Sequence, residues 1–123
     1  MAWDNLGVCN SFNATSAIPD TANFSFVKLD TSGGAVICTQ GDEAIGVVQE
    51  GGLAGDPVPV CRPGAMTKVL CGATVTPGQY VSSDSTGRAV AATSGAHFLG
   101  QVVQGASVNT LAVILFQPNA ARA

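Results

Sequence analysis

One histidine and four cysteines are the residues of this chain whose types could support nucleophilic or metal chemistry. An imidazole beside a thiol can deprotonate it, so His97 next to a cysteine would make a hydrolytic Cys–His pair. His97 lies in the segment GAHFL at 95–99, which is typical of a turn that enters a strand. No serine occupies a G-x-S-x-G nucleophile elbow. A structural role for His97 is therefore the favoured interpretation.

The cysteine spacing does not match a zinc site. Structural zinc sites usually contain close C-x₂₋₄-C pairs, whereas the closest two cysteines here are ten positions apart. Four cysteines allow three disulfide pairings, but a chain of 123 residues can bury a sufficient core without them. We expect no metal, and we expect structural, reduced and partly buried cysteines; their redox state outside a cell is left open. The four are Cys9, Cys38, Cys61 and Cys71.

The carboxylates lie mostly beside glycine or proline, as in DTSGG at 30–34 and in Asp56-Pro57. An aspartate that begins a turn accepts a hydrogen bond from the backbone two residues on, so turn formation explains these residues without catalysis. The one acidic pair, Asp42-Glu43, is typical of a solvated loop. The sequence has no EF-hand or P-loop spacing. We therefore predict no cofactor and no enzymatic activity.

The chain is poor in charge, with 11% charged residues against about 25% in a typical soluble domain. Its 46% apolar residues and net charge of −3 exclude intrinsic disorder. Five basic residues are too few to follow a phosphate backbone, so nucleic acid is not an expected partner. Two explanations of the low charge stay open: a neutral polar β surface, or a surface buried against partners, because interface cores are depleted in charged residues.

The longest apolar run, LAVILF at 111–116, is far shorter than the roughly 20 residues of a membrane-spanning helix. Residues 1–5 carry no positive charge and precede no apolar stretch. We therefore expect no membrane partner and no signal peptide.

Turn formers and β-branched residues dominate the sequence, which has 15 glycines, six prolines and more valine than leucine. Short apolar segments between such turns predict an all-β fold, a small barrel or sandwich of short strands. The two prolines in 57–61 predict an edge strand, because proline cannot donate to a ladder. The run 111–116 is apolar on both faces and predicts a central strand. Strands are expected at 24–29, 35–39, 44–49, 57–61, 65–71, 79–83, 88–92, 98–104 and 110–116.

Two of these segments, 44–49 and 98–104, resemble each other because each places a glycine third in an apolar run. A glycine in that position indicates a bend or a close approach of two backbones. The similarity indicates two strands in related positions.

Residues 1–21 differ from the rest, since they are polar and follow no regular period. We interpret them as an extended N-terminal arm, followed by a single β domain over 22–118 and a C-terminal tail over 119–123. Trp3, Leu6 and Phe12 are isolated apolar residues in this arm. Large aromatic side chains in a tail usually dock somewhere, so Trp3 and Phe12 indicate that the arm is not simply a floppy tail.

A series of motifs from about Gly41 to Phe116 resembles the capsid cement, or head decoration, proteins of tailed bacteriophages. Its most specific part runs from Thr76 to Ala92. The motifs are AIGVV at 44–48, GDPVPV at 55–60, GATVTPGQYVSSD at 72–84, TGRAVAA at 86–92, LGQVV at 99–103 and a final hydrophobic strand at 111–116.

This resemblance implies a small β-barrel-like domain on the outer surface of an icosahedral head, where it stabilises contacts between neighbouring capsomers. The implied partners are the major capsid protein and further copies of the chain, as a homotrimer at threefold or quasi-threefold positions. Trp3, Leu6 and Phe12 would then face the capsid or a neighbour. The resemblance carries over no catalytic residue.

Two other functions stay open at this stage. A small β-sandwich binding module, such as an adhesin or a lectin-like fibre component, would need an exposed aromatic platform, and Trp3 and Tyr80 are the only tryptophan and tyrosine. A Cys–His hydrolase would need His97 close to one of the thiols.

Overall fold

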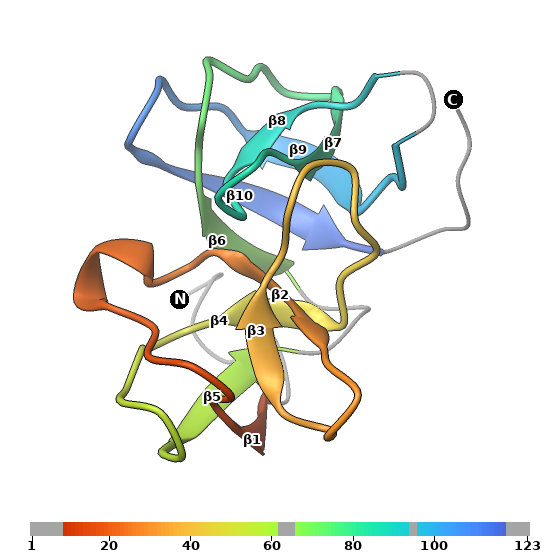
Figure 1. Cartoon of the computed structure of the whole chain (residues 1–123). Coiled ribbons are helices and arrows are strands. Elements are labelled where there is room, and N and C mark those ends of the chain that lie inside the picture. Colours follow the sequence, from red (N-terminus) through yellow and green to blue (C-terminus); the bar gives the residue numbers. More distant parts are fainter. Residues whose placement is uncertain (1–8, 62–65, 94–95, 118–123) are drawn as a thin grey trace.

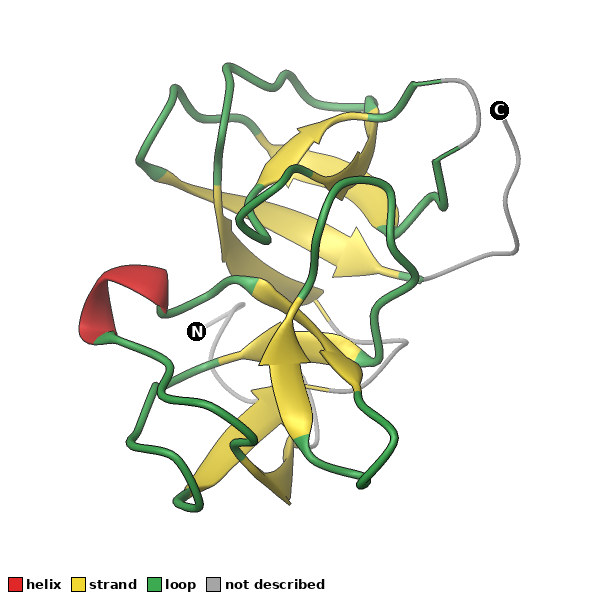
Figure 2. Ribbon diagram, viewed as in Figure 1, coloured by secondary structure: helices red, strands yellow, loops and turns green. Residues whose placement is uncertain are grey.

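Two five-stranded sheets make up the described part of this computed structural model, which covers residues 9–61, 66–93 and 96–117. Every pairing between these strands is antiparallel. The sheets form a sandwich-like arrangement without closing into a barrel, and the described residues contain no α-helix (Figures 1 and 2). The expected all-β fold is confirmed. No helix in the described ranges is long and apolar enough to span a membrane.

The strand orders are β1-β5-β4-β2-β3 in the first sheet and β6-β10-β9-β7-β8 in the second. The first sheet contains β1 (Cys9–Asn13), β2 (Phe26–Leu29), β3 (Ala35–Ile37), β4 (Gly46–Val48) and β5 (Pro57–Cys61), with the short 3₁₀ helix η1 (Asp20–Ala22) before β2. The second sheet contains β6 (Met66–Leu70), β7 (Tyr80–Ser83), β8 (Ala89–Ala91), β9 (Gly100–Gln104) and β10 (Leu111–Phe116).

The two sheets repeat one topology. Replacing β1 to β5 by β6 to β10, strand by strand, converts the first sheet order into the second. Isolated bridges repeat as well: Ala14 pairs in parallel with Ala35, and Cys71 pairs in parallel with Ala89. The chain is therefore an internal duplication, with a first repeat over 9–61 and a second repeat over 66–117. β4 and β9 are equivalent strands, which confirms the relation expected from their shared glycine.

That glycine lies where two backbones touch. A Cβ atom on Gly46 would overlap the carbonyl oxygen of Cys61 in β5, and one on Gly100 would overlap the carbonyl oxygen of Leu115 in β10. Real Cβ atoms do not approach a backbone so closely, so each repeat requires glycine here. The sequence similarity thus marks a close backbone approach that occurs once in each repeat.

The repeats are stacked in series (Figure 1). One face of the first sheet forms the first repeat's own core. The opposite face, with Phe26 and Val47, packs into the core of the second repeat, where the ring centroids of Phe26 and Phe116 are 6.1 Å apart. Full burial of such a side chain contributes about 1.5–3 kcal/mol to stability, so this contact joins the two repeats. The first core contains Ala14, Ile18, Val27, Ala35, Val48, Val58 and Val60.

Part of the expected N-terminal arm belongs to the sheet. Residues Cys9–Asn13 form β1, which pairs with β5 over its whole length. Ala14 and Ile18 are each 2% exposed and lie in the first core. The interpretation of residues 9–21 as an arm is corrected accordingly, whereas residues 1–8 and the tail at 119–123 lie outside the described residues.

The expectation that 57–61 forms an edge strand is wrong, because β5 lies between β1 and β4. β4 pairs with β5 only at Val48↔Val60 and Val47↔Cys61. The two prolines pair with β1 instead and lie where β5 extends past the end of β4. The backbone of Pro59 faces the β4 side, since its carbonyl accepts a hydrogen bond of 2.8 Å from the Gln49 N–H. The missing N–H of Pro59 therefore leaves the ladder with β1 intact, and the β4–β5 ladder ends at the Val48↔Val60 pair beside it. The run 111–116, by contrast, is central as expected, because β10 lies between β6 and β9.

Gly33 and Gly87 lie in equivalent turns, but only the turn at Gly87 touches the other repeat. Substituting each glycine therefore measures how tightly the repeats pack there. Gly33 and Gly87 have φ of +85° and +82°, and a Cβ on Gly87 would lie 2.7 Å from Cγ2 of Ile37, whereas one on Gly33 would meet nothing within 4 Å. Gly33→Ala is expected to cost about 1–2 kcal/mol, the price of left-handed backbone. Gly87→Ala is expected to cost about 1–3 kcal/mol more, from overpacking. Urea unfolding of both variants checks this, and equal losses would contradict it.

Candidate interaction surfaces

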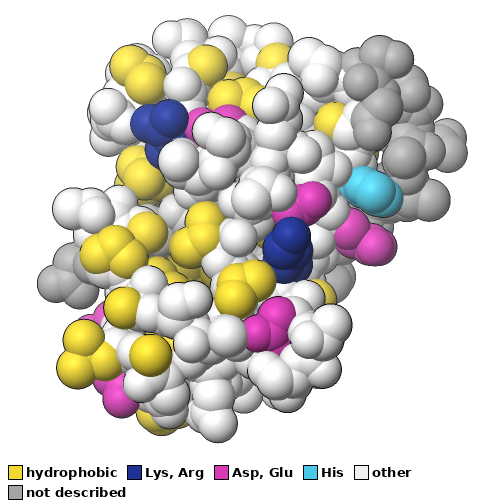
Figure 3. Space-filling view, in the orientation of Figure 1, with side chains coloured by type: hydrophobic (Ala, Val, Ile, Leu, Met, Phe, Trp, Pro, Cys, Tyr) yellow, Lys and Arg dark blue, Asp and Glu magenta, His cyan; other side chains and the backbone are white. Residues whose placement is uncertain are grey.

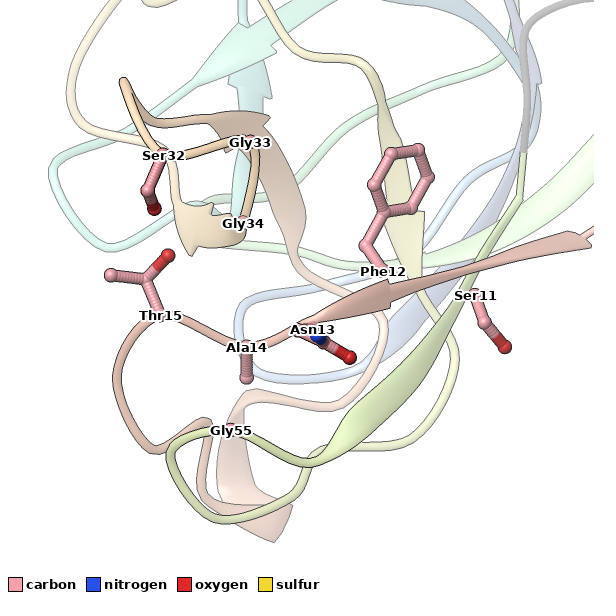
Figure 4. Close-up of a pocket in the computed structure, with 9 residues that line it drawn as sticks. All are labelled: Ser11, Phe12, Asn13, Ala14, Thr15, Ser32, Gly33, Gly34 and Gly55. Carbon is pink, nitrogen blue, oxygen red and sulfur yellow. The ribbon is translucent and has the colours of Figure 1, made fainter.

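A polar groove lies between β1 and the turn that follows β2 (Figure 4), at the end of the first repeat away from the second (Figure 1). Its volume is about 500 Å³, and it is open to solvent. Strand β1 forms one wall, and the turn between β2 and β3 forms the other. We call it the first-repeat groove. It is lined by Ser11, Phe12, Asn13, Ala14, Thr15, Ser32, Gly33, Gly34 and Gly55.

The turn in this wall is held by a carboxylate. Oδ1 of Asp30 accepts hydrogen bonds from the N–H of Ser32 at 2.9 Å and from the N–H of Gly34 at 3.0 Å. In the second repeat, Oδ1 of Asp84 accepts from the N–H of Thr86 at 2.8 Å and of Arg88 at 2.9 Å. The predicted role of these aspartates in turn formation is confirmed.

The equivalent groove in the second repeat is smaller, about 350 Å³, and the first repeat occupies part of it. Its own wall consists of Leu70, Thr86, Arg88 and Asn109, and the first repeat adds Thr21, Ala22 and Ser25. Two backbone hydrogen bonds join the repeats there: the Leu70 N–H donates to the Phe24 carbonyl at 2.9 Å, and the Phe26 N–H donates to the Gly87 carbonyl at 2.8 Å.

The outer face of the second sheet is the second candidate surface. Tyr80 begins β7 as Phe26 begins β2, but Tyr80 is 49% exposed whereas Phe26 is fully buried. The ring of Tyr80 stacks on Phe98, with centroids 5.2 Å apart and planes 13° apart. Gln101 pairs with Tyr80 and is exposed, and Leu111 is 41% exposed. We call this the outer face of the second repeat.

Charged side chains are sparse on the face of the molecule in Figure 3, where uncharged and hydrophobic groups cover most of the view. Two ion pairs occur within the described residues, Lys28–Asp42 at 2.7 Å and Arg88–Asp84 at 3.0 Å. Asp42 of the expected solvated acidic pair thus neutralises a lysine. Partly exposed pairs of this kind contribute little to stability, and their main effect is that opposite charges offset each other locally on the surface.

Hydrogen bonding lowers the pKa of two carboxylates. The hydroxyls of Thr15 and Ser32 and the N–H groups of Gly34 and Ser32 lower the pKa of Asp30 to about 2. Burial alone would raise the pKa of Asp42, but the Lys28 ammonium and the bonds from Thr39 outweigh it and lower this pKa to about 2.

The protein is therefore expected to lose stability as the pH falls from about 4 to 2. Because the pKa of Asp30 is lower in the folded state than the value of about 3.9 in an unfolded chain, its contribution is complete above about pH 5 and disappears as the carboxylate is protonated. Asp30→Asn should flatten this part of the profile of urea midpoint against pH. Glu43→Gln, which removes a carboxylate outside the turn, is the control, and an unchanged profile in Asp30→Asn would contradict the assignment.

The thiols of Cys38 and Cys71 are poorly suited to nucleophilic attack. Burial raises the pKa of the Cys38 thiol to about 12 and also raises the pKa of Cys71, and a thiol that stays protonated is a poor nucleophile. Cys61 is also buried and lies opposite Cys9 in the β1–β5 register. Nδ1 of His97 lies 3.1 Å from the carbonyl oxygen of Gly41. Across 9–61, 66–93 and 96–117, no group of three or more His, Cys, Asp or Glu side chains could hold a metal ion.

Of the three predicted contact residues, the structure describes one. Phe12 is half-buried on β1, packs against the first core and lines the first-repeat groove (Figure 4). Trp3 and Leu6 lie outside the described residues. The turn 32–34 was not predicted to form the opposite wall of this groove, because β1 itself was not predicted.

A repeated all-β fold with sparsely charged exposed surfaces (Figure 3) is typical of a structural or binding protein. The family model for phage cement proteins matches residues 11–116, and the chain belongs to this family. It is thus a structural phage protein, a component of the virion that associates with the exterior of the capsid.

Among solved structures, the chain is similar to the N base of the head fibre gp8.5 of bacteriophage phi29, with a TM-score of 0.70 and 16% identity over 94% of this chain and 98% of that one. At that identity the likeness concerns the fold alone. No curated protein sequence matches the chain.

Proposed function

We propose that this protein is a non-enzymatic cement protein that binds the major capsid protein on the outer surface of an icosahedral head and stabilises contacts between neighbouring capsomers. The observation that carries this proposal is the match to the cement family over almost the whole fold. The neutral surface supports it, because low charge lowers the cost of desolvating a protein interface.

Trp3, Leu6 and Phe12 are the proposed contacts with the capsid or with a neighbouring copy. Phe12 supports this role, since this half-buried residue lines an open groove and the chain has few other aromatic residues. Aromatic anchors contribute strongly to interfaces because they bury a large area at a small cost in conformational entropy.

Co-sedimentation with purified heads that lack this protein tests the proposal. Unexpanded and expanded heads are compared, and saturable binding to expanded heads is the expected result. Binding should also raise the temperature at which these heads open, because a ligand that binds only the intact shell stabilises it by mass action. Absence of binding to both kinds of head would overturn the proposal.

The double substitution Trp3→Ala/Leu6→Ala is expected to weaken head binding at least about tenfold, which corresponds to about 1.4 kcal/mol. Leu53→Ala is the matched control, since it truncates a leucine that is 71% exposed in a loop of the first repeat. Equal binding by both variants would exclude Trp3 and Leu6 as contacts while leaving the cement function intact.

A homotrimer at threefold or quasi-threefold positions is the proposed arrangement on the head. Three linked copies would bind a shell more tightly than one, because each further contact is intramolecular. Cryo-electron microscopy of decorated heads would test the arrangement directly, and density for isolated single copies would contradict it.

A further inference from the structure

The two repeats contact each other through two different surfaces, and because the repeats share one fold, each of them contains both kinds of surface. Within the chain, the first repeat presents Phe26 and the segment before it, and the second repeat receives them on its turn at Gly87 and on Leu70. Each repeat should therefore have one presenting face and one receiving groove.

One presenting face and one receiving groove have no counterpart in the described part of the chain. The presenting face of the first repeat is covered by the second, and the groove of the second is partly filled by the first. The outer face of the second repeat, with Tyr80 in place of Phe26, stays exposed. The first-repeat groove, with Gly33 in place of Gly87, stays open, and a Cβ on Gly33 would meet nothing.

We propose that the outer face of the second repeat binds the first-repeat groove of a second copy of this chain, and that this head-to-tail contact repeats between chains the packing that joins the two repeats within one chain. This proposal goes beyond the cement function and does not depend on capsid binding. Its occupant is a second copy because the same fold already forms this contact with itself once.

The equivalence extends to single hydrogen bonds. Within the chain, the Leu70 N–H donates to the Phe24 carbonyl, and the Phe26 N–H donates to the Gly87 carbonyl. The equivalent bonds between chains join the Asn13 N–H to the Gly78 carbonyl and the Tyr80 N–H to the Gly33 carbonyl. The Tyr80–Phe98 stack would supply the apolar centre, and aromatic residues are enriched at such centres.

The chemistry of the two surfaces is compatible. The groove is lined by Ser, Thr, Asn, Ala and Gly residues and by Phe12, without a charged side chain among its lining residues. The outer face presents Tyr80, Gln101, Val103 and Leu111, which are likewise uncharged and exposed. No like charges would face each other, and burial of the apolar groups would favour association.

Sedimentation velocity of the purified full chain over a range of concentrations tests the proposal. Reversible association is expected, and Tyr80→Arg on the face or Ser32→Trp in the groove should each weaken it at least about tenfold. Val108→Arg is the control, because Val108 is 50% exposed but lies on neither surface. A wild-type chain that stays monomeric up to about 1 mM would overturn the proposal.

Mixing the two variants distinguishes a head-to-tail contact from a symmetric one. Tyr80→Arg retains an intact groove and Ser32→Trp an intact face, so a one-to-one mixture should form heterodimers although neither variant associates alone. A mixture that gains no dimer, or a Ser32→Trp variant that dimerises as well as wild type, would overturn the proposal. Circular dichroism of each variant verifies that it is folded.

Head binding by the same variants separates this inference from the cement function. Tyr80→Arg and Ser32→Trp should retain binding to a single capsid site with lower cooperativity. A monomeric wild-type chain whose head binding is lost in Tyr80→Arg would assign the outer face to the capsid protein, and binding of Tyr80 to a glycan without self-association would assign it to a carbohydrate. Either result would overturn the proposal and leave the cement function to its own test.

Discussion

Gly46→Ala and Gly100→Ala are expected to cost the protein more than about 4 kcal/mol each, a large share of the 5–15 kcal/mol by which a domain is usually stable. The methyl group would overlap a backbone carbonyl oxygen of the neighbouring strand, β5 for Gly46 and β10 for Gly100. A backbone within a ladder cannot yield as a flexible side chain can, so the strands must separate. Urea unfolding followed by circular dichroism measures the loss.

Gly55→Ala is the control for both variants. Gly55 has φ of +87°, and a Cβ there would meet nothing within 4 Å, so this substitution introduces only the backbone strain of about 1–2 kcal/mol. If Gly46→Ala and Gly100→Ala were no more destabilising than Gly55→Ala, the close approach of the strands would be refuted.

Phe26→Ala is expected to destabilise the protein by about 3–5 kcal/mol, the usual cost of removing a buried phenylalanine ring. Phe26 is fully buried between the repeats, against Phe116. Tyr80→Ala truncates the equivalent residue of the second repeat, which is 49% exposed. Its expected cost is only about 1 kcal/mol, from the lost stacking on Phe98.

The difference in cost between these two substitutions measures how differently the two repeats bury one pair of equivalent residues. Both are made at the first residue of an equivalent strand, and the measurement is the free energy of unfolding of dilute protein, below any self-association. Equal costs for the two variants would mean that the second repeat buries its outer face as the first does, in contradiction to the serial stacking.

Local features of the structure were predictable from the sequence because they depend on neighbouring residues. Asp30 and Asp84 bond their own turns, and the turn before β7 has glycine at Gly78, where φ is +90°. The hydrophobic run of β10 identified a central strand for a similar reason, since burial on both faces leaves an apolar sequence.

The N-terminal strand was not predicted because its sequence is mostly polar and contains few apolar residues. In β1, Ser11 and Asn13 are exposed while Phe12 packs inward, and five residues of such a pattern do not stand out beside a polar segment. The groove at Phe12 was therefore beyond prediction, because it requires β1 to lie beside a turn about twenty residues further along the chain.

Only the shared glycine at Gly46 and Gly100 was used to relate the two halves of the sequence, although DTSGGAV at 30–36 and DSTGRAV at 84–90 are also equivalent segments. Backbone requirements are the same in both repeats and preserve glycine, whereas side chains at equivalent positions have different surroundings. Phe26 is buried where Tyr80 is exposed, so the two sequences diverged there.

The serial stacking of the repeats also gives the molecule a polarity, because its two ends carry different surfaces. In a closed ring where the first repeat of each copy meets the second repeat of the next, all copies point in the same rotational direction. The two faces of such a ring are therefore not equivalent. A shell that accepts such a ring distinguishes clockwise from anticlockwise. In such a ring every copy would present its first repeat to one neighbour and its second repeat to the other, so the two faces of the ring would differ.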